Sequence, residues 1–301
     1  YKARFFKPEG RIVDTGNGGV SHTEGQGFAM LMAVANDDKA TFDKLWQWTN
    51  RELKNKENGL FYWRYNPAES NPVADKNNAA DGDVLIAWAL LKADARWHDK
   101  RYSAASDAIT KALVAHSVIR YAGYRVMLPG VQGFKLDGEV VLNPSYFVFP
   151  AWQAFAGRSH LPVWRDLIKD GKRLLGKMGS GKANLPADWV SLTSDGKLEP
   201  AKGWPPRMSY DAIRIPLYLA WSDKQSPLLT PWKAWFGQFP REQTPAWVNV
   251  TTNEYAPYMM EGGLLAVRDL TMGQSSGEPE ITSKDDYYSA SLKMLVWISA
   301  Q

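Results

Sequence analysis

Six helix-length segments that are apolar on nearly every side constrain the fold of this chain more than any other feature. An apolar surface left in water is unfavourable, so a helix without a polar face must be covered on all sides by the rest of the protein. These segments therefore predict an inner layer of buried helices. They are residues 24–36, 81–95, 144–156, 209–221, 255–270 and 286–299.

A second kind of segment alternates with the buried ones and is apolar on one face only. In 38–53, for example, Phe42 and Leu45 share a stripe, while Asp43 and Lys44 lie opposite. Buried helices that alternate with such surface helices through short loops predict a barrel of two concentric helical layers, in which the inner helices run parallel. The other surface segments are 101–117, 161–177 and, more weakly, 226–238.

The rest of the chain predicts little β-structure and one domain. Strand-like alternation is rare, and we expect short β pieces near 59–65, 131–141 and 189–198 to form hairpins in the loops. The 301 residues, of which 45% are hydrophobic, are enough for one large core. No linker or low-complexity tract divides the chain, so residues 1–301 are predicted to form a single domain.

The composition argues against several classes of function. The chain has no cysteine, and its four histidines form no His-Glu-x-x-His pattern, so thiolate zinc sites, cysteine nucleophiles and a zinc hydrolase are not expected. The net charge of +4 is scattered without a run of five basic residues, which argues against a nucleic-acid partner. The longest apolar runs, 28–35 and 84–91, fall far short of the roughly 20 residues that cross a bilayer, so no membrane insertion is expected.

The chain begins at Tyr1, without an initiating Met and without a charged and then apolar leader. This start fits a mature protein whose signal peptide has been removed, although a truncated chain would begin in the same way. We therefore expect a periplasmic or secreted protein.

Most of the candidate reactive residues lie at the starts of the buried segments. If the inner helices run parallel, these starts gather at one end of the barrel. An acid at a helix start complements the helix dipole, and Ser21 with Glu24 fits a capping box, so each carboxylate taken singly has a structural explanation. Gly25, Gly27 and Gly82, however, are expected to leave open space beside the acids, and a carboxylate on a buried helix is costly unless it is paired or faces a cleft. The starts are residues 21–27, 80–83, 143–146, 209–214, 253–255 and 285–288.

A cleft in which carboxylates converge beside aromatic rings suits the hydrolysis of glycosidic bonds. In this reaction one acid protonates the leaving oxygen, and a second carboxylate attacks the sugar or activates water. The 14 Trp and 13 Tyr supply flat faces that stack on sugar rings, although most of them are expected to fill the core. Some aromatic residues lie in loops or at helix mouths, and we predict that these are stacking platforms: Tyr62, Trp63, Trp204, Tyr287 and Tyr288.

Five motifs, spread in order through most of the chain, resemble those of the family 8 glycoside hydrolases. This family comprises bacterial endo-acting enzymes, including cellulases encoded beside bacterial cellulose synthases. The resemblance implies an all-α (α/α)6 barrel of six inner and about six outer helices, and an inverting endo-β-1,4-glucanase without a metal or organic cofactor. The motifs are Thr23-Glu24-Gly25-Gln26-Gly27, Ala80-Asp81-Gly82-Asp83, Asn143-Pro144-Ser145-Tyr146, Ser209-Tyr210-Asp211-Ala212-Ile213-Arg214 and Tyr287-Tyr288.

The resemblance also implies roles for single residues. Glu24 would be the general acid, and Asp211 would be the general base that activates water. Asp81 would bind and distort the sugar next to the scissile bond, and Tyr146 would position that sugar or the water. Arg214, one helical turn after Asp211, would hold the base ionised by charge pairing.

The resemblance leaves alternatives open. Other branches of the family, among them chitosanases and some xylanases, take their base from an inserted segment, so the presence of Asp211 favours the cellulase branch. Chitosanase, xylanase or mixed-linkage glucanase activity is the alternative within the family, and a non-catalytic glycan-binding protein is the alternative outside it. The expected partner is a β-glucan, either cellulose or its oligosaccharides. We expect a monomer. The resemblance implies either a role in bacterial cellulose production, with a functional association with the cellulose synthase machinery, or a digestive role, because secreted digestive relatives share the same motifs.

Overall fold

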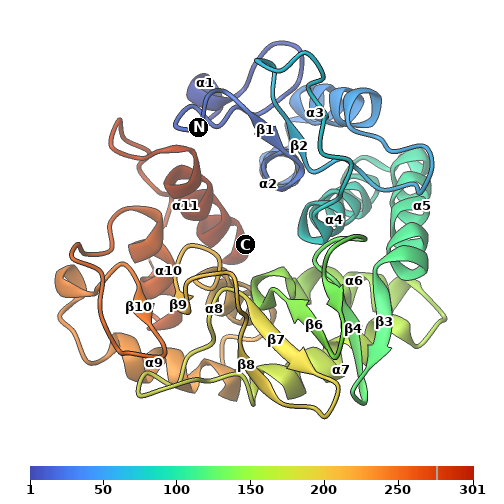
Figure 1. Ribbon diagram of the computed structural model, residues 1–301. Coiled ribbons are helices and arrows are strands. Elements are labelled where there is room, and N and C mark those ends of the chain that lie inside the picture. The colour runs from blue at the N-terminus through green and yellow to red at the C-terminus, as the bar shows by residue number, and fades with distance from the viewer. Residues whose placement is uncertain (276) are drawn as a thin grey trace.

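Six helices form a closed inner ring in the computed structural model, which describes residues 1–275 and 277–301 (Figure 1). Each helix packs against the next one in the chain, and the last packs against the first. The two-layered helical barrel predicted from the sequence is therefore confirmed. The inner helices are α2 (Thr23–Ala35), α4 (Ala80–Trp97), α6 (Phe149–Arg158), α8 (Arg214–Ser222), α10 (Gly263–Thr271) and α11 (Tyr287–Ser299).

The first turns of neighbouring inner helices lie together, as expected for parallel helices. Arg214 at the start of α8 donates a hydrogen bond to Tyr288 in the first turn of α11 (2.9 Å). The backbone N–H of Gly263 at the start of α10 donates to the hydroxyl of Ser289 in the same turn of α11 (2.8 Å). The N-terminal ends of these helices thus share one end of the barrel.

The outer layer is less complete than predicted. It consists of four helices and one short turn of helix, whereas about six outer helices were expected. Within the described residues, the connection from α10 to α11 has no helix, because residues 272–286 hold only Met272 and Ile281 as large apolar side chains and so lack an apolar stripe. The outer elements are α1 (Lys2–Phe5), α3 (Lys39–Glu52), α5 (Lys100–His116), α7 (Val163–Leu175) and α9 (Thr230–Phe236).

Three inner helices begin later than their apolar segments do. The segment 144–156 starts with the 3-10 turn η1 (Pro144–Tyr146), and α6 follows only from Phe149. Residues 209–213 form a turn before α8, and residues 255–262 form a loop that ends at Gly262, where φ is 52°. Tyr146 and Asp211 therefore lie outside the α-helices, each just before an inner helix. Two further 3-10 turns are η2 (Pro227–Leu229) and η3 (Arg241–Gln243).

The β-structure lies in the loops, and two of the three predicted hairpins are present. Strands β5 and β6 near 131–141 and strands β7 and β8 near 189–198 each pair as an antiparallel hairpin, and the two hairpins join in one sheet with the order β5-β6-β7-β8. The prediction near 59–65 was wrong, because β2 pairs with β1 instead. A separate hairpin is formed by β3 and β4, and β9 pairs with β10. The strands are β1 (Ser21–His22), β2 (Arg64–Tyr65), β3 (Val118–Tyr121), β4 (Tyr124–Met127), β5 (Lys135–Leu136), β6 (Glu139–Leu142), β7 (Val190–Thr193), β8 (Leu198–Pro200), β9 (Arg207–Met208) and β10 (Val248–Asn249).

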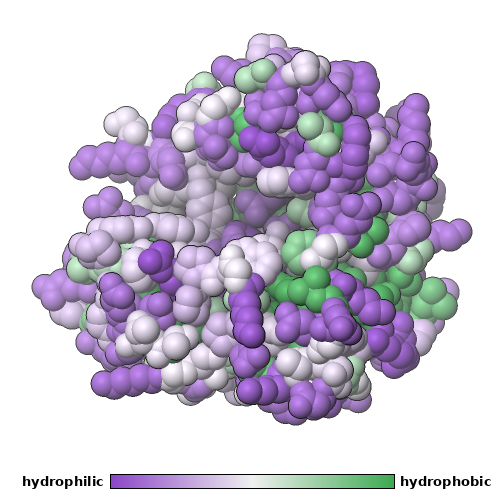
Figure 2. Space-filling model, viewed as in Figure 1, coloured by the Kyte–Doolittle hydropathy of each residue, from purple (hydrophilic) through white to green (hydrophobic). Residues whose placement is uncertain are grey.

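The strands gather at the end of the barrel that holds the N-terminal ends of the inner helices, and this end faces the viewer in Figure 1. The space-filling view from the same side shows that this face is hollowed near its centre and rimmed by hydrophilic residues (Figure 2). Among the helices that the structure describes, none combines the length and the apolar character needed to cross a membrane.

Candidate active site

Arg214 joins three carboxylates at the hollowed end of the barrel. Its Nη2 lies 3.5 Å from Oε2 of Glu24 and 3.7 Å from Oδ2 of Asp81. Its Nη1 lies 3.5 Å from Oδ1 of Asp211. The acids come from the first turns of α2 and α4 and from the turn before α8, so one guanidinium brings together residues that are far apart in the sequence.

Arg214 is itself held in place by two hydroxyl groups. It donates hydrogen bonds to Ser145 Oγ (2.9 Å) and to the hydroxyl of Tyr288 (2.9 Å). Its side chain is only 2% exposed. A cation buried this deeply requires charged or polar partners, and the three carboxylates with the two hydroxyls supply them. The hydroxyl of Tyr288, whose ring is predicted to stack on a sugar, helps to orient Arg214.

The three carboxylates differ in their exposure to solvent. The side chain of Glu24 is 23% exposed and that of Asp211 is 35% exposed, whereas that of Asp81 is 4% exposed. Glu24 and Asp211 are thus open to a substrate and to water, while Asp81 lies behind them. This division fits two reacting groups and one supporting group.

Asp81 is the most perturbed acid of the site. The pKa of its carboxyl lies well above the usual range. Burial is the largest cause, and the nearby negative charge of Glu24 is the second. Arg214 opposes this shift, and the N–H of Gly82 donates to Asp81 Oδ1 (2.8 Å). Burial and the charge of Glu24 thus both favour the protonated form of Asp81.

Asn143 is a partner of Asp211 that the sequence analysis did not single out. Its Nδ2 donates to Oδ2 of Asp211 (3.2 Å), and its Oδ1 accepts from the hydroxyl of Ser145 (2.5 Å). Both residues belong to the motif that contains Tyr146, but only the tyrosine was given a role. Tyr146 lies beside the acids, since burial and then the charge of Asp81 raise the pKa of its hydroxyl well above the usual range.

The glycines beside the acids do not leave open space, so that expectation was wrong. A Cβ on Gly82 would lie 2.0 Å from Thr23 Oγ1, and one on Gly27 would lie 2.6 Å from the Cβ of Leu85. A Cβ on Gly25 would lie 2.5 Å from the hydroxyl of Tyr287. These glycines let neighbouring inner helices approach closely, and their approach brings Asp81 to Glu24.

A row of aromatic rings stands beside Tyr146. Trp204, one of the predicted platforms, stacks on Trp189 with ring centroids 4.7 Å apart, and Trp189 stacks on Phe134 at 5.7 Å. The ring of Tyr146 meets Trp189 edge to face. Trp189 and Phe134 were missed because both lie in segments expected to form strands, where aromatic residues are common.

The remaining predicted platforms have different surroundings. Trp63 stacks on His22 with centroids 5.5 Å apart and donates its indole N–H to Asp75 (2.8 Å), which leaves one face of the ring uncovered by this pair. The ammonium of Lys76 lies 4.7 Å from the ring centroid of Tyr62. Tyr287 is only 5% exposed and packs against Phe5, so it belongs to the core rather than to a sugar platform.

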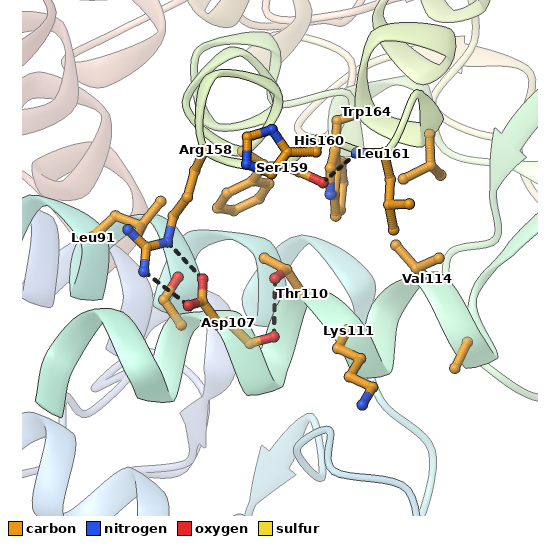
Figure 3. A pocket seen from close by; sticks show the side chains of 14 residues that line it. Leu91, Asp107, Thr110, Lys111, Val114, Arg158, Ser159, His160, Leu161 and Trp164 are labelled. Carbon is orange, nitrogen blue, oxygen red and sulfur yellow. Dashed lines mark hydrogen bonds and ion pairs between the residues drawn. The ribbon is translucent and has the colours of Figure 1, made fainter. Parts of the chain in front are cut away.

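A pocket of about 750 Å³ lies outside the inner ring, between α5 and the segment that joins α6 to α7 (Figure 3). Its walls are largely apolar and include Leu91, Val114 and Trp164. Asp107 in this pocket is bound by both Nε and Nη2 of Arg158, at 2.7 and 2.8 Å. The pocket contains none of the predicted site residues and lacks converging carboxylates, so it is not the candidate active site.

No group of three or more His, Asp or Glu residues suited to a metal ion occurs in the part of the chain that the structure describes. The three acids at Arg214 share a cation that the protein itself provides.

Comparison with known proteins gives a consistent result. The family described as glycosyl hydrolases family 8 matches residues 1–301. An endoglucanase of Cellulomonas uda is 64% identical over 284 residues, which cover 94% of this chain and 79% of that protein. The crystal structure of an endoglucanase described as a family 8 glycosyl hydrolase from Klebsiella pneumoniae superposes with a TM-score of 0.99 at 66% identity, covering 100% of this chain and 97% of that one. An endo-β-1,4-glucanase from Acetobacter xylinum has a TM-score of 0.95 at 39% identity, covering 99% and 95%.

Proposed function

Because this chain belongs to glycosyl hydrolases family 8, we propose that it is an endo-β-1,4-glucanase that hydrolyses internal bonds of cellulose or soluble β-glucan. The observation that carries the proposal is the convergence of Glu24, Asp81 and Asp211 on Arg214, in a chain that is 64% identical to an endoglucanase. Two of these acids are accessible to solvent, as a reaction with a polymer and water requires.

In the proposed reaction, Glu24 donates a proton to the glycosidic oxygen while Asp211 takes a proton from a water molecule. The water oxygen forms a bond to the anomeric carbon on the face opposite the leaving group, and the bond from that carbon to the glycosidic oxygen breaks. The sugar configuration at this carbon is thereby inverted. Afterwards, solvent restores the proton of Glu24 and removes that of Asp211.

The geometry of Arg214 supports this pair. Because Glu24 and Asp211 each lie 3.5 Å from one guanidinium, their contacting oxygens are no more than about 9 Å apart, so both acids can reach one glycosidic bond. The inverting outcome itself is proposed from membership of the family. Arg214 keeps a positive charge between the two acids.

Asp81 and Tyr146 are proposed to act on the sugar next to the scissile bond. Asp81 lies against Glu24 and is protected from water, so it is suited to hold a sugar hydroxyl at the point of cleavage. The aromatic row formed by Trp189, Trp204 and Phe134 supports stacking of further sugars on this side of the site.

We further propose that residues 1–301 form one catalytic domain, since the family match spans them and their buried residues form a nearly continuous core. A periplasmic or secreted location, a monomeric state and an association with the cellulose synthase machinery complete the proposal. Its support is the family resemblance. Crosslinking of the full-length protein in cells that make cellulose tests the association, and the absence of any crosslink to the synthase contradicts it.

Chitosan, xylan and mixed-linkage glucan are the competing substrates. The Bifidobacterium adolescentis relative named a reducing end xylose-releasing exo-oligoxylanase is 28% identical, far below the 64% of the endoglucanase, so cellulose is favoured. Reducing ends released from carboxymethyl cellulose and from these three polymers test the preference. Glucan binding without release of reducing ends from any of them supports a non-catalytic binding protein instead.

Glu24→Gln and Asp211→Asn test the assigned pair. Each change is expected to lower kcat on carboxymethyl cellulose by at least about 100-fold, because it removes one proton transfer. Near-full activity in either variant contradicts the assignment of that residue. Proton NMR of the first product detects inversion of the anomeric carbon directly.

A further inference from the structure

Asp211 lies in a turn rather than in a helix, so its position depends on what holds that turn. The turn spans residues 209–213, between β9 and α8. Helix α8 has no side-chain cap from the residue at its own N-terminus, Ile213. The N–H groups of Ile213, Arg214 and Ile215 donate to carbonyls of the turn, so the N–H groups that need another partner are those of Ser209 and Ala212.

Asp188, which precedes β7 and is far away in the sequence, supplies that partner. Its Oδ1 accepts hydrogen bonds from the backbone N–H of Ser209 (3.0 Å) and of Ala212 (2.8 Å). Its own N–H donates to the carbonyl of Arg207 (2.8 Å). One residue therefore fixes the chain before Asp211 and directly after it.

Asp188 is also coupled to the site by charge and by its neighbour in the sequence. Burial and then the charge of Asp211 raise the pKa of Asp188 to about 7, against the opposing effects of the two backbone N–H groups and of Arg214. The next residue, Trp189, stacks on Trp204 in the aromatic row. The same short segment thus contacts both the turn that carries the base and the rings that face the sugar.

We propose that Asp188 is a positioning residue that sets the distance between Asp211 and the attacked sugar carbon, an inference that rests on the proposed function. A displacement of about 1 Å in a reacting group lowers the rate by about 100-fold. The carboxylate of Asp188 does not contact the substrate; it acts through the two backbone hydrogen bonds that hold the base.

Two substitutions separate the hydrogen bonds of Asp188 from its charge. Asp188→Ala removes both and is expected to lower kcat by about 100-fold with little change in KM. Asp188→Asn keeps an oxygen that accepts from both N–H groups, so it is expected to retain kcat within about tenfold. Asp99→Ala removes a comparable contact, the cap of outer helix α5 that accepts from Arg101 N–H (3.0 Å), and is expected to leave kcat unchanged.

The pH dependence of kcat gives a readout that a merely structural role would not move. Below about pH 6 the carboxyl of Asp188 is protonated, so Asp188→Asn and the wild type are expected to have the same profile. Above about pH 7 the wild type gains a negative charge near Asp211 and Arg214, which the variant lacks. The two profiles are therefore expected to diverge above about pH 7.

The experiment measures kcat, KM and the pH profile on carboxymethyl cellulose, with circular dichroism to measure the folded fraction. A folded Asp188→Ala that keeps kcat within about threefold overturns the inference. If Asp188→Ala does not fold, Asp188→Ser decides, because its shorter side chain cannot accept from both N–H groups, and a folded Asp188→Ser that keeps kcat within about threefold overturns the inference. A wild-type protein that releases no reducing ends contradicts the proposed function instead, so the two failures are distinguishable.

Discussion

The guanidinium of Arg214 lies 3.7 Å from the carboxyl of Asp81, and both side chains are almost fully buried. Arg214 also contacts Glu24 and Asp211, so one cation offsets the repulsion among three acids. The N-terminal ends of the inner helices lie at one end of the barrel, and these acids lie there with them. Changes to the charge or position of these side chains are therefore expected to alter both stability and activity.

Replacement of Arg214 by Met is expected to destabilise the protein by about 3–5 kcal/mol and to abolish activity, because it leaves buried carboxylates without their cation. Urea unfolding and release of reducing ends measure the two effects. Arg158→Met breaks an ion pair whose side chains are 44% and 52% exposed, and it is expected to cost no more than about 1 kcal/mol. Equal losses in the two variants would contradict the role of Arg214.

Asp81→Asn is expected to leave the free energy of unfolding at pH 7 within about 1 kcal/mol of the wild-type value, because asparagine resembles the protonated acid that burial and Glu24 favour. Activity is expected to fall by about 100-fold, since the amide, unlike the acid, cannot ionise to offset positive charge that develops on the sugar. A large loss of stability, measured by urea unfolding at pH 7, would show that Asp81 is ionised in the resting protein.

Gly82→Ala is expected to destabilise the protein by about 1–3 kcal/mol, because the added carbon would lie 2.0 Å from Thr23 Oγ1 and force α4 away from α2. The same displacement separates Asp81 from Glu24, so kcat is expected to fall as well. The matched control is Gly157→Ala in helix α6, where the added carbon meets nothing within 4 Å. There, higher helix propensity is expected to increase stability by about 0.5–1 kcal/mol without a change in kcat.

Asp83 links the stability of the fold to pH. Burial is the main cause that raises the pKa of its carboxyl to about 7, although Asn78 and the N–H of Phe61 donate hydrogen bonds to it. The folded state therefore binds more protons than the unfolded state between about pH 4 and pH 7, so this group's contribution is full below about pH 4 and is lost as pH rises to about 7.

The free energy of unfolding that this group loses as pH rises is expected to be on the order of 4 kcal/mol at most. Urea unfolding of the wild type at pH 5 and pH 8 is expected to show the loss, and Asp83→Asn is expected to show a smaller one. If the variant and the wild type lose the same free energy between these pH values, Asp83 is not responsible.

Trp204→Ala is expected to raise KM for cellohexaose about fivefold to tenfold while kcat changes little, because a stacked ring contributes about 1 kcal/mol to sugar binding in the ground state and the transition state alike. Trp204→Phe keeps a flat ring and is expected to retain most of the affinity. A KM unchanged in Trp204→Ala would exclude this ring from the sugar-binding surface.

The sequence was informative where a residue's role follows from its position on an inner helix. Glu24 and Asp81 begin α2 and α4, and parallel packing alone brings such starts together. It was less informative for residues that act through partners far away in the chain. Asp188 caps a turn more than 20 residues away, and no local pattern around residue 188 marks that contact. Trp189 was missed for the same reason, since its role depends on Phe134 and Trp204.

By itself, the sequence determined the helical barrel and the end of it that holds the acids, because hydrophobic burial follows directly from the spacing of apolar residues. Only the tertiary structure decided which acid is buried, which two are exposed and how they share Arg214. Burial and electrostatic interactions depend on distances between segments that the chain brings together only on folding. The glycines show this most clearly: next to an acid in the sequence, Gly82 suggests open space, but in the fold that space is filled by Thr23.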